Sequence, residues 1–320
     1  MKRIEEFDMI KGILIIYVVV YHCAILVGTL GLWGILDKMI IAMMASAMLA
    51  FIMISGFVYR PKEEPAVREI IQRIKSLLLP YYIYCIPILV GFFIVYVLVE
   101  GRSLGWYADG LISILGQVQG THFFSDVPPI HEMFYSAWPC WYIFQLAVAY
   151  IIFIPVQRLL KGKPRYMQIL SALLLLALGA ILYMLDLQGL NGQDFPMTTK
   201  IFILPNNFGF AGVLTIGKCL SEYKAAELTS LKAYAKIPAI VISLSLLIVL
   251  YLSDDYFYLL PLAKWGAFGV YSYFITPICG LALFFLLYML CNRLKYIDCI
   301  GKLLGFFGKN SAQSQILCDG

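Results

Sequence analysis

The sequence predicts an all-α protein, a polytopic bundle of about eight transmembrane helices with a cytoplasmic N-terminus. Of the 320 residues, 62% are hydrophobic and 13% are charged, about half the ~25% charged fraction usual in soluble domains. The mean hydropathy is +0.84, and the apolar runs are long enough for helices that cross a bilayer. So few charges cannot cover the surface of a soluble protein of this length, which excludes a cytosolic enzyme, a secreted disulfide scaffold and a disordered chain.

Eight apolar runs predict the transmembrane helices, because a helix needs about 20 residues to cross the hydrocarbon core. We expect these helices near residues 12–32, 39–58, 77–99, 139–156, 167–187, 200–220, 237–253 and 267–290. The first run is no cleavable signal peptide, since it lacks a small-residue cleavage site and a second span follows closely. We expect one membrane domain over residues 1–311 and a short polar tail at 312–320.

The distribution of lysine and arginine predicts the orientation, because the cytoplasmic segments of membrane proteins are enriched in both. With the N-terminus in the cytoplasm, the inner segments hold 20 of the 24 Lys and Arg residues. The outer segments hold the other four, which are Lys38, Arg102, Lys200 and Lys264. The net charge of +5 therefore reflects topology. Because the cations are spread over five inner segments, we expect contacts with membrane lipids and no nucleic acid partner.

Neither a metal site nor a bound cofactor is predicted. The eight cysteines form no C-x-x-C pair, and several lie inside apolar runs, where cysteine is a small hydrophobic side chain. The loop residues His122 and His131 have acidic neighbours but lack the ligand spacing of a known metal site.

The first span carries the strongest candidate site, which consists of Asp8, Lys11 and His22. Ionisable side chains inside a membrane are costly, so each is a functional candidate. Lys11 and His22 are 11 residues apart, about three helical turns, so we expect both on one face about 16 Å apart along the axis. Asp8 precedes Lys11 by three residues and can pair with it. A neutral His22 imidazole could take a proton from an attacking hydroxyl; a hydrogen bond between helices is the structural alternative.

Three candidates for binding a donor or substrate lie near the predicted cytoplasmic side. Ser55 and the adjacent Gly56 permit close helix contact. Arg60 either binds a ligand or anchors the helix end in the manner of other cytoplasmic arginines. Arg73 lies in a basic amphipathic segment, where it binds either an anionic ligand or a lipid headgroup.

Two further candidates come from the fourth and sixth spans. Trp141 is expected at the outer interface, where aromatic side chains gather. Asn206 follows a proline inside the sixth span, so its amide either satisfies the carbonyl that the proline frees or lines a substrate cavity.

Four sequence blocks, in order along the first half of the chain, resemble the acyltransferase 3 family of integral membrane O-acyltransferases. The first block, R-x4-D-x2-K-G-I-x-I-x2-V-V-x2-H, runs from Arg3 to His22. The second is MISGFVYR, which ends at Arg60, and the third is RIKSLLLPYYIY, which begins at Arg73. The fourth is CWYIFQLA, which contains Trp141. Lys11 stands where many members have arginine, as in the branch that resembles fucose 4-O-acetylases.

The resemblance implies an O-acetyltransferase, a bacterial plasma-membrane enzyme that modifies cell-envelope polysaccharide. It implies transfer of an acyl group, usually acetyl, from cytoplasmic acetyl-CoA to a hydroxyl of a cell-surface glycan or lipid-linked sugar. It further implies that His22 is the catalytic base and that Lys11 and Arg60 position the donor. The acyl-CoA is then a donor substrate and no bound cofactor.

Two features depart from the family pattern. Tyr21 precedes His22 where glycine or serine is frequent. The family normally has ten spans, and its G-K-x-S element, here Gly308 to Ser311, leads into the ninth, so we expect the last two helices to be missing. A transporter or flippase for a polar or lipid-linked sugar, which would share a polar interior, and a non-catalytic membrane module remain alternatives.

Overall fold

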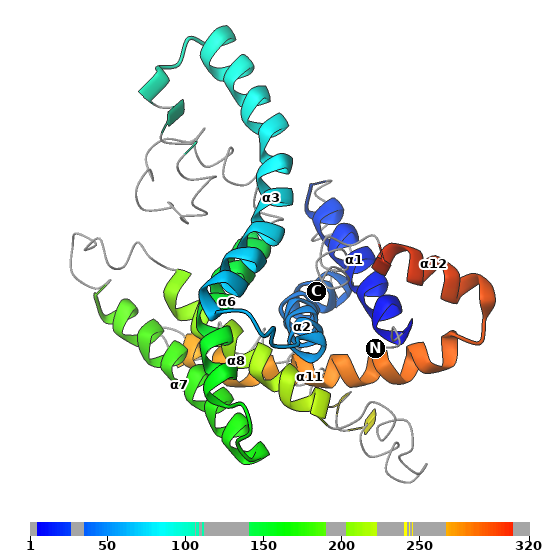
Figure 1. Cartoon of the computed structure of the whole chain (residues 1–320). Helices are drawn as coiled ribbons and strands as arrows, with labels where there is room; N and C mark the ends of the chain where they lie inside the picture. The colour runs from blue at the N-terminus through cyan, green and yellow to red at the C-terminus, as the bar shows by residue number, and fades with distance from the viewer. Residues whose placement is uncertain are drawn as a thin grey trace.

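The computed structural model describes residues 5–26, 35–105, 107–108, 111, 141–189, 203–222, 240–241, 243, 245 and 267–309. The regular structure of these residues is entirely helical, so the predicted all-α class is confirmed. The helices, shown in Figure 1, are α1 (Glu5–Leu26), α2 (Ile35–Val58), α3 (Ala66–Phe92), α6 (Trp141–Leu159), α7 (Arg165–Gly189), α8 (Ile203–Glu222), α11 (Ala267–Leu294) and α12 (Asp298–Lys309), with a π-helix, η1 (Phe93–Val99), continuing α3.

Three helical segments in the described part of the chain are long and apolar enough to cross a membrane. They are Ala66–Val99, Arg165–Leu182 and Pro277–Leu294; two shorter apolar segments are Ser46–Val58 and Ile143–Leu159. The predicted count of eight spans stays a prediction. The seventh, at 237–253, and the tail at 312–320 lie almost wholly outside the described residues.

Helix α2 lies at the centre of the bundle. Every residue from Ser46 to Phe57 is buried, as expected for a helix that is hydrophobic all round. One face packs against α8, in an apolar cluster shared with α6, and the other packs against α1 and α11. Helix α2 therefore separates two apolar clusters, one on each of its sides.

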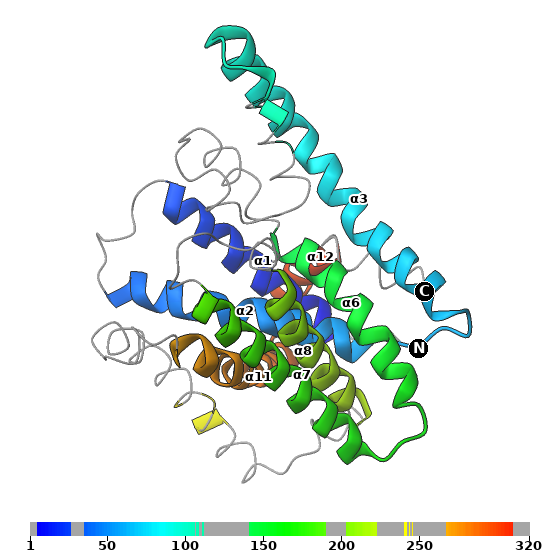
Figure 2. The same ribbon diagram turned by 90° about the vertical axis from the view of Figure 1, so that its left-hand side faces the viewer.

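Helix α3 begins earlier than the predicted third span. It starts at Ala66, so the basic amphipathic segment and the apolar span form one continuous helix. Two internal prolines, Pro80 and Pro87, remove backbone donors without ending it. The far half of α3 projects beyond the other helices in both views (Figures 1 and 2), and it leaves five large apolar side chains exposed, Leu79, Ile83, Tyr84, Ile86 and Val90.

Helix α12 was not among the predicted helices. It packs along α1 at two glycines, where an added Cβ on Gly308 would overlap the carbonyl oxygen of Asp8 and one on Gly12 would overlap that of Leu304. Glu6 also accepts a 2.7 Å ion pair from Lys295, in the turn between α11 and α12. The start of α1 is therefore held from two sides, by α11 and by α12.

A short polar path joins α6 to α8 inside the apolar core. Gln157 Nε2 donates to Thr215 Oγ1 at 3.3 Å, and Thr215 Oγ1 donates to the Ala211 carbonyl at 2.8 Å. Both side chains are buried. The path fixes the contact of the two helices near their C-terminal halves.

Replacing Thr215 by valine should destabilise the protein by about 1 kcal/mol, because the buried Gln157 amide loses its acceptor. The midpoint of thermal unfolding in detergent measures this change. Thr215→Ser keeps the hydroxyl and is the matched control. A Thr215→Val midpoint equal to that of Thr215→Ser would show that the path adds no stability.

Candidate active site

A buried ion pair occupies the start of α1. Lys11 Nζ lies 3.9 Å from Asp8 Oδ1, and the two side chains are 4% and 6% exposed. The pairing predicted from their three-residue spacing is therefore present. Phe7 packs beside them against Phe57, with ring centroids 4.7 Å apart, so an aromatic cluster encloses this end of the helix.

Helix α1 runs without interruption from Glu5 to Leu26. Its backbone therefore carries His22 about 16 Å along the axis from Lys11. The side chains of His22, Trp141 and Asn206 lie outside the described residues. Their roles stay predictions.

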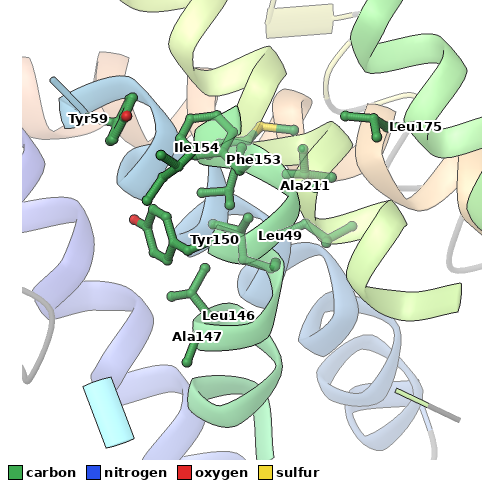
Figure 3. Packing of buried hydrophobic residues seen from close by; sticks show 14 of the residues in the cluster. Leu49, Tyr59, Leu146, Ala147, Tyr150, Phe153, Ile154, Leu175 and Ala211 are labelled. Atoms are coloured by element: carbon green, nitrogen blue, oxygen red, sulfur yellow. The ribbon is translucent and has the colours of Figure 1, made fainter. Parts of the chain in front are cut away.

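Arg73 lies between two tyrosine rings. Its guanidinium carbon is 6.0 Å from the ring centre of Tyr59 and 5.9 Å from that of Tyr150, which is cation–π range. Arg73 is 8% exposed, and its Nε has no hydrogen-bond partner. In the described part of the chain, its side chain forms neither an ion pair nor a hydrogen bond. Figure 3 shows Tyr59 and Tyr150 on the same side of the apolar cluster.

Tyr59 follows the last residue of α2 and is the tyrosine of the MISGFVYR block. Burial raises the pKa of its phenol well above the usual range, and the negative charge of Glu69 raises it further. The hydroxyl lies close to the Glu69 carboxylate but makes no hydrogen bond of regular geometry with any described residue. Tyr59 therefore stays neutral at physiological pH and offers a proton donor beside Arg73.

Two residues that sequence reasoning missed complete this cluster. Glu69 is fully buried at the start of α3, and its Oε2 accepts a 2.8 Å ion pair from Arg158 at the end of α6. Arg158 had been counted only as one of the cytoplasmic cations. The sequence signal was weak, because an acid four residues before Arg73 most often belongs to a solvated helix face.

We call Tyr59, Glu69, Arg73, Tyr150 and Arg158 the inner cluster. It joins α2, α3 and α6 at the side predicted to be cytoplasmic. It contains two guanidinium groups and one carboxylate, which leaves an excess of one positive charge. Such a group attracts anions, and an arginine with open donors suits phosphate or carboxylate.

The other predicted site residues that the structure describes are not part of the inner cluster. Ser55 is buried, and its Oγ donates to the Phe51 carbonyl at 3.0 Å, so its hydroxyl is used within its own helix. Arg60 is exposed. Phe7 and Ile10, which neighbour the Asp8–Lys11 pair in the chain, belong to one apolar cluster, whereas Tyr59 and Tyr150 of the inner cluster belong to the other.

In α8 the structure favours a different asparagine as a site residue from the one that the sequence predicted. Asn207, next to Asn206, is fully buried, and among the residues that the structure describes neither atom of its amide has a hydrogen-bond partner. A buried amide without partners is uncommon and costs free energy. Asn207 is thus a stronger candidate for contact with a bound polar group than sequence reasoning indicated.

Comparison with protein families gives a match over nearly the whole chain. The family model that matches residues 4–312 is that of acyltransferase 3, described as an acyltransferase domain. Comparison with curated proteins and with solved structures gave no match. The match includes α1 and the inner cluster, and it covers far more than half of the 320 residues. The chain therefore belongs to the acyltransferase 3 family, and it is a membrane acyltransferase.

Proposed function

We propose that this membrane acyltransferase transfers an acetyl group from acetyl-CoA to a hydroxyl of a cell-envelope glycan or lipid-linked sugar. The site of action is the bacterial plasma membrane. The observation that carries the proposal is the excess positive charge of the inner cluster, where Arg73 is buried and no acidic side chain among the described residues pairs with it. A buried charge of this kind is costly unless it binds an anion.

The donor fits the inner cluster by its chemistry. Coenzyme A carries several phosphate oxygens, and a guanidinium binds phosphate through paired, charge-assisted hydrogen bonds. Arg73 is proposed to bind one of these phosphates, with the neutral Tyr59 hydroxyl as a second donor. Arg60, which is exposed near the same helix end, is proposed to attract the donor from the cytoplasm.

The proposed chemistry assigns His22 the part of general base. The acceptor hydroxyl oxygen attacks the thioester carbonyl carbon while His22 takes its proton. The carbon–sulfur bond breaks as the carbon–oxygen bond forms, and the proton returns to the departing thiolate of coenzyme A. The buried Asp8–Lys11 pair is proposed to hold α1 in register for this step.

The test of this function is acetyl transfer in membranes that contain the protein. Membranes from cells with and without the gene are incubated with isotopically labelled acetyl-CoA, and glycans and lipid-linked sugars are analysed by mass spectrometry. We expect the labelled acetyl mass difference only where the protein and acetyl-CoA are both present, and alkaline hydroxylamine should remove an O-linked ester.

Two outcomes would contradict the proposal. One is a lack of labelled product from acetyl-CoA with the glycans of the native cell as acceptors. The other is sugar counterflow across vesicles without any acyl donor, which would favour the transporter alternative. Comparing the surface glycans of a deletion strain with those of its complemented control identifies the acceptor.

A further inference from the structure

The charges of the inner cluster are paired in an unexpected way. Glu69 precedes Arg73 by four residues on α3, the spacing at which oppositely charged side chains of a helix usually pair. Glu69 instead pairs at 2.8 Å with Arg158, which is 89 residues away on α6. No ion pair between Glu69 and Arg73 forms, although both side chains are buried.

Arg158 is well placed to hold Glu69. Besides the carboxylate, its Nη2 donates to the backbone carbonyls of Lys62 and Glu64, in the segment that joins α2 to α3. These contacts fix the guanidinium against the start of α3 from a second direction. Its side chain is 28% exposed, whereas Glu69 is completely buried, so Arg158 supplies the counter-charge from the water side.

We propose that Arg158 is a positioning residue that keeps Glu69 from neutralising Arg73. While Arg158 holds the carboxylate, the guanidinium of Arg73 stays available to an anionic group of the acyl donor. This inference rests on the proposed function, because it takes the donor phosphate as the ligand of Arg73. Arg158 itself need not contact the donor.

The ion pair that Glu69 would otherwise form with Arg73 explains why a separate cation is needed. Without Arg158, the buried Glu69 would be left unpaired, which is strongly unfavourable. The nearest remedy is the ion pair with Arg73, one helical turn away. The donor would then compete with a preformed carboxylate for the same guanidinium. The loss should therefore appear in donor affinity.

The test is the affinity of purified protein in lipid nanodiscs for two anions, coenzyme A and inorganic pyrophosphate, by isothermal titration calorimetry. We expect Arg158→Met to weaken the binding of both anions by about tenfold or more. The anion then loses a charge-assisted hydrogen bond from Arg73, which Glu69 occupies instead. Adding Glu69→Gln to Arg158→Met should restore both affinities, because glutamine cannot neutralise Arg73. A merely structural role for Arg158 predicts no such rescue.

Two control variants accompany the pair. Arg293→Met removes an exposed cation near the same predicted side of the membrane and should leave both affinities within about twofold, as exposed charges interact weakly. Arg158→Lys keeps the charge that holds Glu69 and should keep most of the affinity. It also tests the idea should Arg158→Met fail to fold, which thermal unfolding reports.

Each outcome separates the two proposals. Unchanged affinity in Arg158→Met, no recovery in the double variant, or an Arg158→Lys loss as large as that of Arg158→Met would overturn the role of Arg158 and leave the transferase intact. Pyrophosphate binding without coenzyme A binding would overturn the donor but keep the anion site. Binding of neither probe by the wild type would overturn the anion site itself.

Discussion

Replacing His22 by alanine is expected to lower the rate of acetyl transfer by about 10²- to 10⁴-fold, the usual contribution of a general base. The imidazole is the group of α1 whose pKa in water lies near working pH. Because His22 is proposed to act on the acceptor proton and not on the donor phosphates, the loss should appear in kcat, with KM for acetyl-CoA nearly unchanged. Initial rates in membranes at several acetyl-CoA concentrations measure both constants.

The matched control is the same substitution at a histidine that the sequence predicts to lie in a loop. His131→Ala removes an imidazole in the segment between α3 and α6 and should leave the rate unchanged. The alanine variant of His22 should also bind coenzyme A with the affinity of the wild type, which separates a chemical defect from misfolding. Equal product from wild type and His22→Ala would remove His22 from the mechanism.

Adding one methyl group at the contact of α2 with α8 is expected to cause a large loss of stability. A Cβ on Gly56 would overlap the carbonyl oxygen of Leu214, and one on Gly217 would overlap that of Met53. Both obstacles are backbone atoms of packed helices, so the helices must separate. We expect Gly56→Ala and Gly217→Ala each to cost about 1–3 kcal/mol, the usual range for an overpacked core.

Gly91→Ala is the matched control for these two variants. It makes the same change in a helix, α3, but an added Cβ there meets nothing within 4 Å. Alanine should therefore raise stability by about 0.5–1 kcal/mol through helix propensity alone. Midpoints of thermal unfolding in detergent rank the three variants. A Gly56→Ala midpoint at or above that of Gly91→Ala would show that α2 and α8 do not pack this closely in the membrane.

The apolar runs predicted the helix positions well where the side chains of a whole span are apolar and face either the core or lipid. Helix α2 covers the predicted second span, since nearly any apolar sequence of that length becomes a helix in a membrane. The same reasoning missed α12, because at 12 residues it is too short to cross a bilayer and is stabilised by contact with α1. It also missed the early start of α3, since an amphipathic turn and an apolar span have different compositions yet form one helix.

The site was predictable only where the partners are close in sequence. The Asp8–Lys11 pair follows from helical spacing. The pairing of Glu69 with Arg158 joins helices that are distant in the chain, and spacing on α3 alone favours the wrong partner, Arg73. An arginine at a cytoplasmic helix end is also the commonest kind of charge in a membrane protein, so nothing in its local sequence distinguishes Arg158.

The ion pair between Glu69 and Arg158 also orders events during synthesis. A ribosome makes α3 long before α6, because 89 residues separate the two charges. Until then the nascent chain holds an acidic group that needs a counter-ion, and the start of α3 cannot reach its final burial. Its mature packing is therefore completed only after translation has passed residue 158, so a chain interrupted earlier would expose this acid to the quality-control machinery of the cell.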